Sequence, residues 1–161
     1  MASKRGTALA DDFAAANDEA VTFARSCSDA QWAIVVPGEE WTVGVVLHHI
    51  AEGHRNVMRW LEAMAKGEAV TDTVEIIDET NVEHAGRAAE AGQEETAELL
   101  TTNGTHLEAM LRNLSDEELD RTARFGPAGG RTMATEALAE VTTRHVRGHL
   151  DHALAAVEAA E

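Results

Sequence analysis

Histidines at two places in the chain have the residue type and spacing of a metal site. His145 and His149 stand four residues apart in a strongly helical stretch, which puts both imidazoles on one face of a helix, one turn apart. His49 follows Trp41 and Thr42 in an earlier helical stretch. A third imidazole from a neighbouring helix would complete a three-nitrogen site for a divalent ion. The open side of such an ion is where chemistry would take place.

The other histidines set the alternatives to this interpretation. His48 adjoins His49, and adjacent residues point about 100° apart on a helix, so the two cannot both face one site. His152 follows His149 by three residues and could be a fourth ligand, a hydrogen-bonding partner of a ligand or a proton shuttle. A lone inward histidine is more often a hydrogen-bonded core residue. A bundle with only structural histidines therefore stays open as an alternative.

Further polar residues could serve a reaction at this site. His84 could enter the same pocket from a third helix, or it could lie exposed near a helix end. Arg144 and Arg147 flank the histidine pair and could hold a substrate carboxylate, although pairing with Glu140 and Asp151 is favoured. The chain contains no tyrosine, so a general base would have to come from His48, Glu52, His84 or His152.

Turn signals divide the chain into four helical blocks that would position these residues. A break at Val36-Pro37-Gly38 precedes the second block, which has Thr42 as its N-cap and ends at Gly67. Residues Gly126 to Gly130 form the clearest loop of the sequence. The predicted blocks cover residues 7–30, 42–66, 73–113 and 132–159.

The third block is the weakest of the four. Gly86, Gly92 and Gly104 each lower its helix propensity by up to about 1 kcal/mol, so a kink or break is expected there. After this block, Ser115 is followed three residues later by Glu118, which is a capping-box pattern. This pattern predicts a short helix between the third and fourth blocks.

The hydrophobic pattern favours an all-α protein. Sustained period-two alternation is missing, and although residues 70–77 and 121–125 resemble short strands, no sheet is expected. The simplest architecture is an antiparallel four-helix bundle in which the second and fourth blocks share a common interior. At 161 residues the chain is expected to form a single helical-bundle domain, residues 1–161.

Composition excludes several classes of partner. The net charge of −16 argues against binding to nucleic acid, because no basic patch could offset that field. No apolar run approaches the roughly 18–20 residues that a membrane span needs. Cys27 is the only cysteine, so no intramolecular disulfide can form, and a reducing cytoplasm is the expected location.

Four segments together resemble the DinB-like superfamily. Residues 41–50 resemble the W-[S/T]-x6-H-[L/I] opening of the family's second helix, in which the metal-binding histidine lies eight positions after the tryptophan and corresponds to His49. Residues 145–149 resemble the family's C-terminal His-x3-His pair. Residues 77–81 resemble its I-D-x-x-N segment, and residues 126–132 resemble the Gly-rich turn before its last helix. Each motif alone is weakly specific, but their order and spacing favour the family.

The resemblance implies a DinB-like four-helix bundle, usually a homodimer, with a divalent transition metal on His49, His145 and His149. Zinc is expected first, with nickel or iron as alternatives. Family members described as mycothiol-dependent maleylpyruvate isomerases and bacillithiol transferases use the metal to activate a low-molecular-weight thiol. At the position of His152 the family often carries glutamine, and here this histidine is expected to act in catalysis as a proton relay.

The leading functional expectation is therefore a metal-dependent thiol S-transferase that acts on a small-molecule electrophile, with mycothiol as a candidate thiol. A metal-dependent hydrolase or isomerase on the same site is the first alternative, because a metal can activate water or polarise a carbonyl. A non-catalytic bundle that binds a metal or a small molecule is the second alternative.

Overall fold

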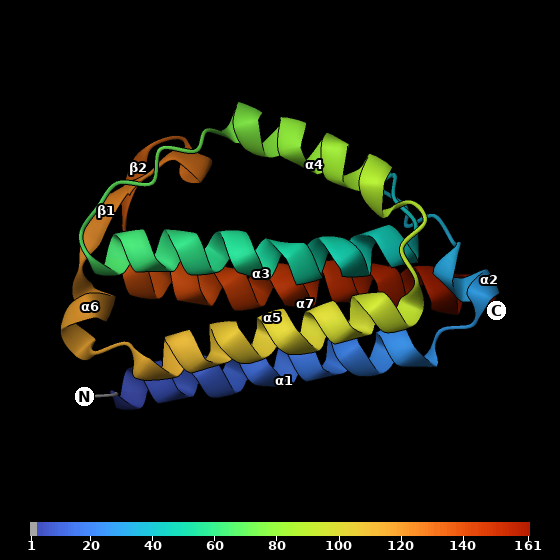
Figure 1. Cartoon of the computed structure of the whole chain (residues 1–161), viewed down its shortest axis with the longest axis horizontal. Helices are drawn as coiled ribbons and strands as arrows, with labels where there is room; N and C mark the ends of the chain where they lie inside the picture. Colours follow the sequence, from blue (N-terminus) through green and yellow to red (C-terminus); the bar gives the residue numbers. More distant parts are fainter. Residues whose placement is uncertain (1–2) are drawn as a thin grey trace.

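The structure is a computed structural model that describes residues 3–161. Its elements are α1 (Lys4–Ser26), α2 (Asp29–Trp32), α3 (Val43–Ala65), α4 (Val74–Ala88), α5 (Gln93–Asn113), α6 (Asp116–Asp120), β1 (Thr122–Phe125), β2 (Arg131–Ala134) and α7 (Thr135–Ala160). The four long helices α1, α3, α5 and α7 lie side by side as a bundle, and α4 lies outside it along α3 (Figure 1). The predicted helical four-helix bundle is confirmed.

Contacts between helix ends fix the direction of the bundle helices. Gln93 at the start of α5 donates a hydrogen bond to the carbonyl of Cys27 at the end of α1, so these helices are antiparallel. Arg5 near the start of α1 bonds Glu136 near the start of α7, so these two run the same way. Because α4 returns the chain to the end where α3 began, α3 and α5 also run in the same direction (Figure 1). The bundle therefore consists of two antiparallel pairs, α1 with α5 and α3 with α7.

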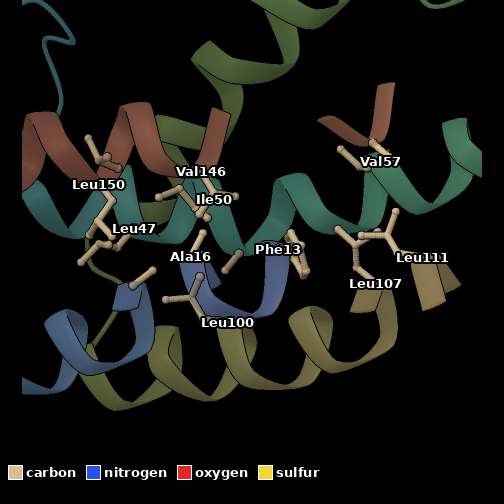
Figure 2. Close-up of a cluster of buried hydrophobic side chains, with 14 of the residues drawn as sticks. Phe13, Ala16, Leu47, Ile50, Val57, Leu100, Leu107, Leu111, Val146 and Leu150 are labelled. Carbon is tan, nitrogen blue, oxygen red and sulfur yellow. The ribbon is translucent and has the colours of Figure 1, made fainter. Parts of the chain in front are cut away.

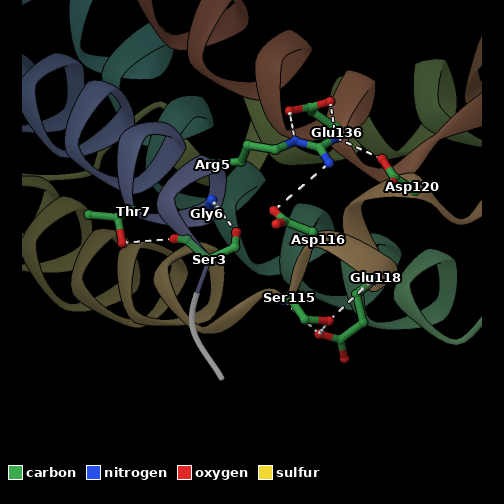
Figure 3. Close-up of polar contacts among 9 residues, drawn as sticks. All are labelled: Ser3, Arg5, Gly6, Thr7, Ser115, Asp116, Glu118, Asp120 and Glu136. Carbon is green, nitrogen blue, oxygen red and sulfur yellow. Dashed lines mark hydrogen bonds and ion pairs between the residues drawn. The ribbon is translucent and has the colours of Figure 1, made fainter.

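Side-chain caps explain where several helices begin. The hydroxyl of Ser3 accepts a hydrogen bond from the Gly6 amide at 2.8 Å, and Figure 3 shows this contact at the start of α1. The predicted capping box is present at α6, where the Ser115 hydroxyl accepts from the Glu118 amide and the Glu118 carboxylate accepts from the Ser115 amide. The same view shows Arg5 joining α1 to α6 and α7 through Asp120 and Glu136.

The core lies between the four long helices and is filled mainly by aliphatic side chains. Small residues on α1 face the bundle, which lets α5 pack closely against it. Each fully buried aliphatic side chain contributes about 1.5–3 kcal/mol through removal of its surface from water. Figure 2 shows this cluster, which includes Phe13, Ala16, Leu47, Ile50, Val57, Leu100, Leu107, Leu111, Val146 and Leu150.

One polar network crosses this core. The His54 Nε2–H group of α3 donates to the Asn17 Oδ1 atom of α1 at 2.8 Å, and the Asn17 side-chain amide donates to the carbonyl of Leu100 on α5 at 3.0 Å. A Cβ atom at Gly104 would lie 2.1 Å from Asn17 Nδ2, so α5 needs a glycine there. The network therefore joins three helices in a place where only a residue without a side chain fits beside it.

The third predicted block is divided into two helices. The break falls at Gly92, whose extended backbone begins α5, and the indole of Trp32 donates to the carbonyl of Ala91 beside it at 3.1 Å. Of the residues of α4, only His84 and Ala88 are buried, and Val82 is 73% exposed. The predicted break is confirmed, and its consequence is a helix that lies apart from the bundle.

The expectation of no sheet was wrong. Strands β1 and β2 pair antiparallel, with Thr122 opposite Ala134 and Phe125 opposite Arg131. Gly129 and Gly130, with φ values of 69° and 74°, close the hairpin in a conformation that glycine adopts without strain. Among residues 3–161, no helix is long and apolar enough to cross a bilayer.

Candidate metal centre

Three histidines from two antiparallel helices meet at one point of the structure. One nitrogen each of His49 on α3 and of His145 and His149 on α7 lies within 4.8 Å of the other two. The ring centroids are 5.5 Å apart for His49 and His145, 5.0 Å for His49 and His149, and 4.3 Å for His145 and His149. The residues singled out from the sequence are thus brought together with a spacing that one metal ion could bridge.

Local structure at the start of α3 positions the first of these histidines. Thr42 caps the helix by accepting a hydrogen bond from the Val45 amide at 3.2 Å. Trp41 precedes this cap, and its ring packs against the His49 imidazole with a centroid separation of 5.0 Å. The tryptophan that introduces the helix therefore also supports the ring.

The surroundings keep the imidazoles of His49 and His145 neutral. Burial, and after it the repulsion by the neighbouring His149 and His145 when charged, lower the pKa of His49 to about 3. Desolvation by the surrounding protein, followed by the nearby His149, lowers the pKa of His145 to about 4, although this side chain is exposed where it faces a cavity. A neutral imidazole keeps the lone pair that a metal requires.

A carboxylate from the loop before α3 orients the third histidine. Glu39 accepts hydrogen bonds from His149 Nδ1 at 2.7 Å and from His152 Nδ1 at 2.8 Å, and its side chain is only 10% exposed. Because Nδ1 of His149 donates, its Nε2 atom carries the free lone pair. This is the contact by which proteins commonly fix a metal-ligating histidine.

The loop that presents Glu39 has an uncommon backbone. Glu40 has φ of 60°, the only positive value for a non-glycine residue among residues 3–161, and Gly38 has φ of 85°. A left-handed conformation at a residue with a Cβ costs roughly 1 kcal/mol and is often kept for a functional reason. No spacing pattern indicates Glu39, because its loop lies more than a hundred residues from the histidine pair.

The structure separates His152 from the three-histidine cluster. Its side chain is 63% exposed, and its Nδ1 atom donates to Glu39, the carboxylate that also accepts from His149. The arginines beside the pair also point away: Arg144 lies 3.8 Å from Glu140, as favoured from the sequence, whereas Arg147 pairs with Asp12 rather than with the expected Asp151. These arginines therefore do not line the cavity beside the histidines.

A cavity of about 660 Å³ opens beside His49 and His145, with walls from α3, α4, the hairpin and α7. Its lining is mostly apolar, and the indole of Trp60 in the wall is held by Asp72, which accepts its N–H at 2.7 Å. No aspartate or glutamate occurs among the described residues that line it. The polar groups that it offers besides histidine are Asn56, Thr80, Asn81, Arg131, Thr132 and Thr142.

His48 and His84 lie together but outside this cluster. They are both buried, and they meet Glu52 at the contact between α3 and α4. Neither expectation for His84, entry into the pocket or exposure near a helix end, describes this position. Helical geometry explains the separation of His48 from His49, since adjacent residues on α3 point to different faces.

The fold and these motifs define a family. The sequence profile of the DinB superfamily matches residues 12–153, so the chain belongs to the DinB superfamily. Among solved structures it is similar to YfiT from Bacillus subtilis, described as a probable metal-dependent hydrolase with an unusual four-helix bundle topology. The similarity covers 99% of this chain and 90% of that chain, with a TM-score of 0.82 and 18% sequence identity. No curated protein gives a significant sequence match.

Proposed function

We propose that the protein is a metal-dependent enzyme that activates a low-molecular-weight thiol for transfer to a small electrophile. In this proposal a divalent transition metal, zinc first and nickel or iron as alternatives, is held by His49, His145 and His149. The observation that supports it is the position of the three imidazoles beside a mostly apolar cavity. A homodimer in the cytoplasm is part of the same proposal, because family members usually pair.

The donor set fits such a metal. Imidazole nitrogens suit zinc, nickel, iron and copper, and three protein ligands are typical of catalytic sites, which keep a further position open. The lowered pKa values of His49 and His145 favour the unprotonated form that binds metal. The hydrogen bond from His149 to Glu39 leaves Nε2 of that ring available.

The surrounding residues would divide the remaining tasks. A divalent metal held by His49, His145 and His149 would lower the pKa of a thiol or water bound to it. The apolar walls exclude water, while Asn56, Asn81 and Thr142 can orient polar groups of the reactants. In the reaction, the thiolate sulfur forms a bond to the electrophilic carbon, and the leaving group departs with its bonding electrons. We assign His152 a positioning role, in which it holds Glu39 and thereby His149.

The lining of the cavity favours a thiol over water as the nucleophile. Activation of water for hydrolysis usually involves a general base, and no carboxylate among the described residues lines the cavity. A thiol is more acidic than water, and once ionised it needs no base. The cavity of about 660 Å³ also has room for two small reactants. Hydrolysis is the second candidate, and the description of YfiT as a probable metal-dependent hydrolase supports it.

The test compares thiol transfer and hydrolysis in the same preparations. Zinc- or nickel-loaded wild type and His149→Ala are incubated with mycothiol and an aryl chloride electrophile, and thioether formation is followed by absorbance. The proposal expects turnover that needs both thiol and metal and is lost in His149→Ala. His106→Ala is the matched control, because this exposed histidine on α5 lies outside the cluster. Thiol-independent cleavage of small esters or amides would support the hydrolase, and tight metal binding without turnover would favour a non-catalytic bundle.

A further inference from the structure

A second group of metal-binding side chains lies at the contact between α3 and α4. His48 and Glu52 stand one turn apart on α3, and His84 comes from α4. The His48 Nδ1 and His84 Nε2 atoms are 2.8 Å apart, and His84 Nε2 is 3.8 Å from the Glu52 carboxylate. All three ligand atoms lie within 4.8 Å of one another. Two nitrogens and one carboxylate oxygen thus converge on one point.

The protein alone leaves this group incompletely satisfied. His48 and His84 are 8% and 3% exposed, and two facing neutral imidazoles can share only one proton between them. The Nδ1 atom of His84 is buried and has no hydrogen-bond partner within residues 3–161. This orphaned atom lies across the ring from Nε2, so the case for a ligand rests on the convergence of His48 Nδ1, His84 Nε2 and the Glu52 carboxylate.

We propose that His48, Glu52 and His84 bind a second divalent transition metal, separate from the three-histidine cluster. Two histidines and one carboxylate are an established ligand set for zinc and for iron. Zinc–nitrogen bonds of about 2.0–2.1 Å in tetrahedral geometry need the two nitrogens about 3.3 Å apart. The rings would therefore separate by roughly half an ångström from their present contact, a shift that small side-chain rotations supply.

The two sites share helix α3 but use different faces of it. The His84 ring centroid lies 5.6 Å from that of His49 and 5.1 Å from that of His48. Its ligand nitrogen groups with Glu52 and not with the histidines of α7. Loss of either site should consequently leave the ligands of the other in place.

Metal at this second site would hold α4 against the bundle. Only His84 and Ala88 of α4 are buried, so few other contacts fasten this helix. On its other side α4 contributes Ile77, Thr80 and Asn81 to the wall of the cavity. The second ion would thereby fix one wall of the cavity without touching the reactants.

The test counts metal ions in defined variants. Metal-free protein is dialysed against zinc and then against metal-free buffer, and bound zinc is measured by elemental analysis. We expect two equivalents in the wild type and in the His106→Ala control, and one equivalent in His84→Ala and Glu52→Gln. Glu52→Gln keeps the side-chain volume, so it guards against a folding defect in His84→Ala. His149→Ala should also retain one equivalent, now at the second site.

The variants separate this proposal from the proposed function. One equivalent in the wild type that His84→Ala and Glu52→Gln leave unchanged would overturn the second site. Loss of all metal in His84→Ala, with circular dichroism unchanged, would also overturn it, because His84 would then belong to the first site. If His149→Ala keeps the wild-type stoichiometry while His84→Ala loses one equivalent, the second site stands and the three-histidine site fails.

Hydrogen exchange tests the role of the second ion in fastening α4. In His149→Ala, added zinc should slow amide exchange across residues 74–88, and it should have no such effect after the further change Glu52→Gln. Equal exchange with and without zinc in His149→Ala would overturn the fastening of α4.

Discussion

Helix α3 carries two histidines whose pKa values are both lowered to about 3, yet their surroundings differ. His54 lies in the core and donates to Asn17, which in turn donates to a carbonyl of α5. His49, five residues earlier, faces two further imidazoles and a cavity. Burial is the main cause of both shifts.

The comparison of His54 with His49 shows that a lowered pKa and a functional site are different properties. His54 has a hydrogen-bond partner, so its low pKa follows from burial in a well-packed core. His49 is placed where ligand atoms of three side chains converge and where one side remains open. A lowered pKa alone therefore does not identify a site, whereas the convergence of lone pairs beside a cavity does.

The largest effect is expected when a ligand is removed from the three-histidine site. His149→Ala should lower zinc affinity at the three-histidine site by more than about 100-fold, because loss of a ligand exceeds the 10- to 100-fold effect of losing a ligand's supporting partner. The stability of the metal-free protein should change little, since this side chain is partly exposed. Calorimetric titration and thermal unfolding measure the two quantities, and unchanged affinity would contradict the assignment.

The corresponding change in the core network of His54 and Asn17 is His54→Ala. It should lower the free energy of unfolding by about 2–4 kcal/mol, because it leaves Asn17 Oδ1 unpaired and creates a cavity. Metal stoichiometry should stay the same. Urea denaturation beside the exposed control His106→Ala, expected within about 0.5 kcal/mol of wild type, measures the difference. Metal loss in folded His54→Ala would remove the distinction between the two regions.

A smaller loss of zinc affinity is expected when Glu39, the carboxylate that orients His149, is replaced. Glu39→Gln should weaken zinc binding about 10- to 100-fold, because the amide is a poorer acceptor for His149 and His152 than the carboxylate. Glu40→Gln is the matched control, since it alters the neighbouring exposed residue without touching a histidine of the site. Equal affinities of the two variants, measured by competition with a zinc chelator, would show that Glu39 has no such role.

The lowered pKa of His54 should make the free energy of unfolding depend on pH. Its pKa is about 3 in the folded chain and about 6.5 in the unfolded chain, so between these values the unfolded chain binds more protons. The contribution is fully present above about pH 6.5 and decreases as pH falls toward 3, by up to about 1.4 kcal/mol per pH unit. His54→Gln keeps a donor for Asn17 but cannot titrate. Urea denaturation from about pH 7 to about pH 5 should therefore show a shallower slope in this variant than in wild type.

The smallest effect is expected for His152→Ala. Its side chain is 63% exposed and supports Glu39 with one hydrogen bond, so zinc affinity should fall by no more than about tenfold. In the metal-loaded protein the change should lower kcat of thiol transfer more than it raises KM, if His152 acts through the orientation of His149. Complete loss of metal would instead make His152 a ligand.

Local spacing allowed much of the fold and the three-histidine cluster to be predicted. The His145–His149 pair depends only on the helical repeat, whereas the choice of His49 over His48 came from the resemblance of residues 41–50 to the DinB-like superfamily. The caps at Thr42 and Ser115 are likewise local, because a side chain bonds an amide three residues ahead. Such features need no knowledge of the tertiary arrangement.

The remaining features depend on contacts between distant segments. Glu39 meets His149 from a loop more than a hundred residues away, and His84 reaches His48 only because α4 crosses back along α3. The hairpin was missed because its four-residue strands are too short to show a period-two pattern. Its residues are extended through pairing with each other, which is a tertiary effect.

The turn that carries Glu39 has a consequence for protein engineering. Someone grafting the three histidines onto a plain helical bundle could copy their positions from helical geometry alone. The graft would lack the carboxylate, because a loop presents it with Gly38 and Glu40 in left-handed conformations. Transplanting the loop together with the two helices should therefore be the minimum unit for moving this histidine arrangement to another scaffold.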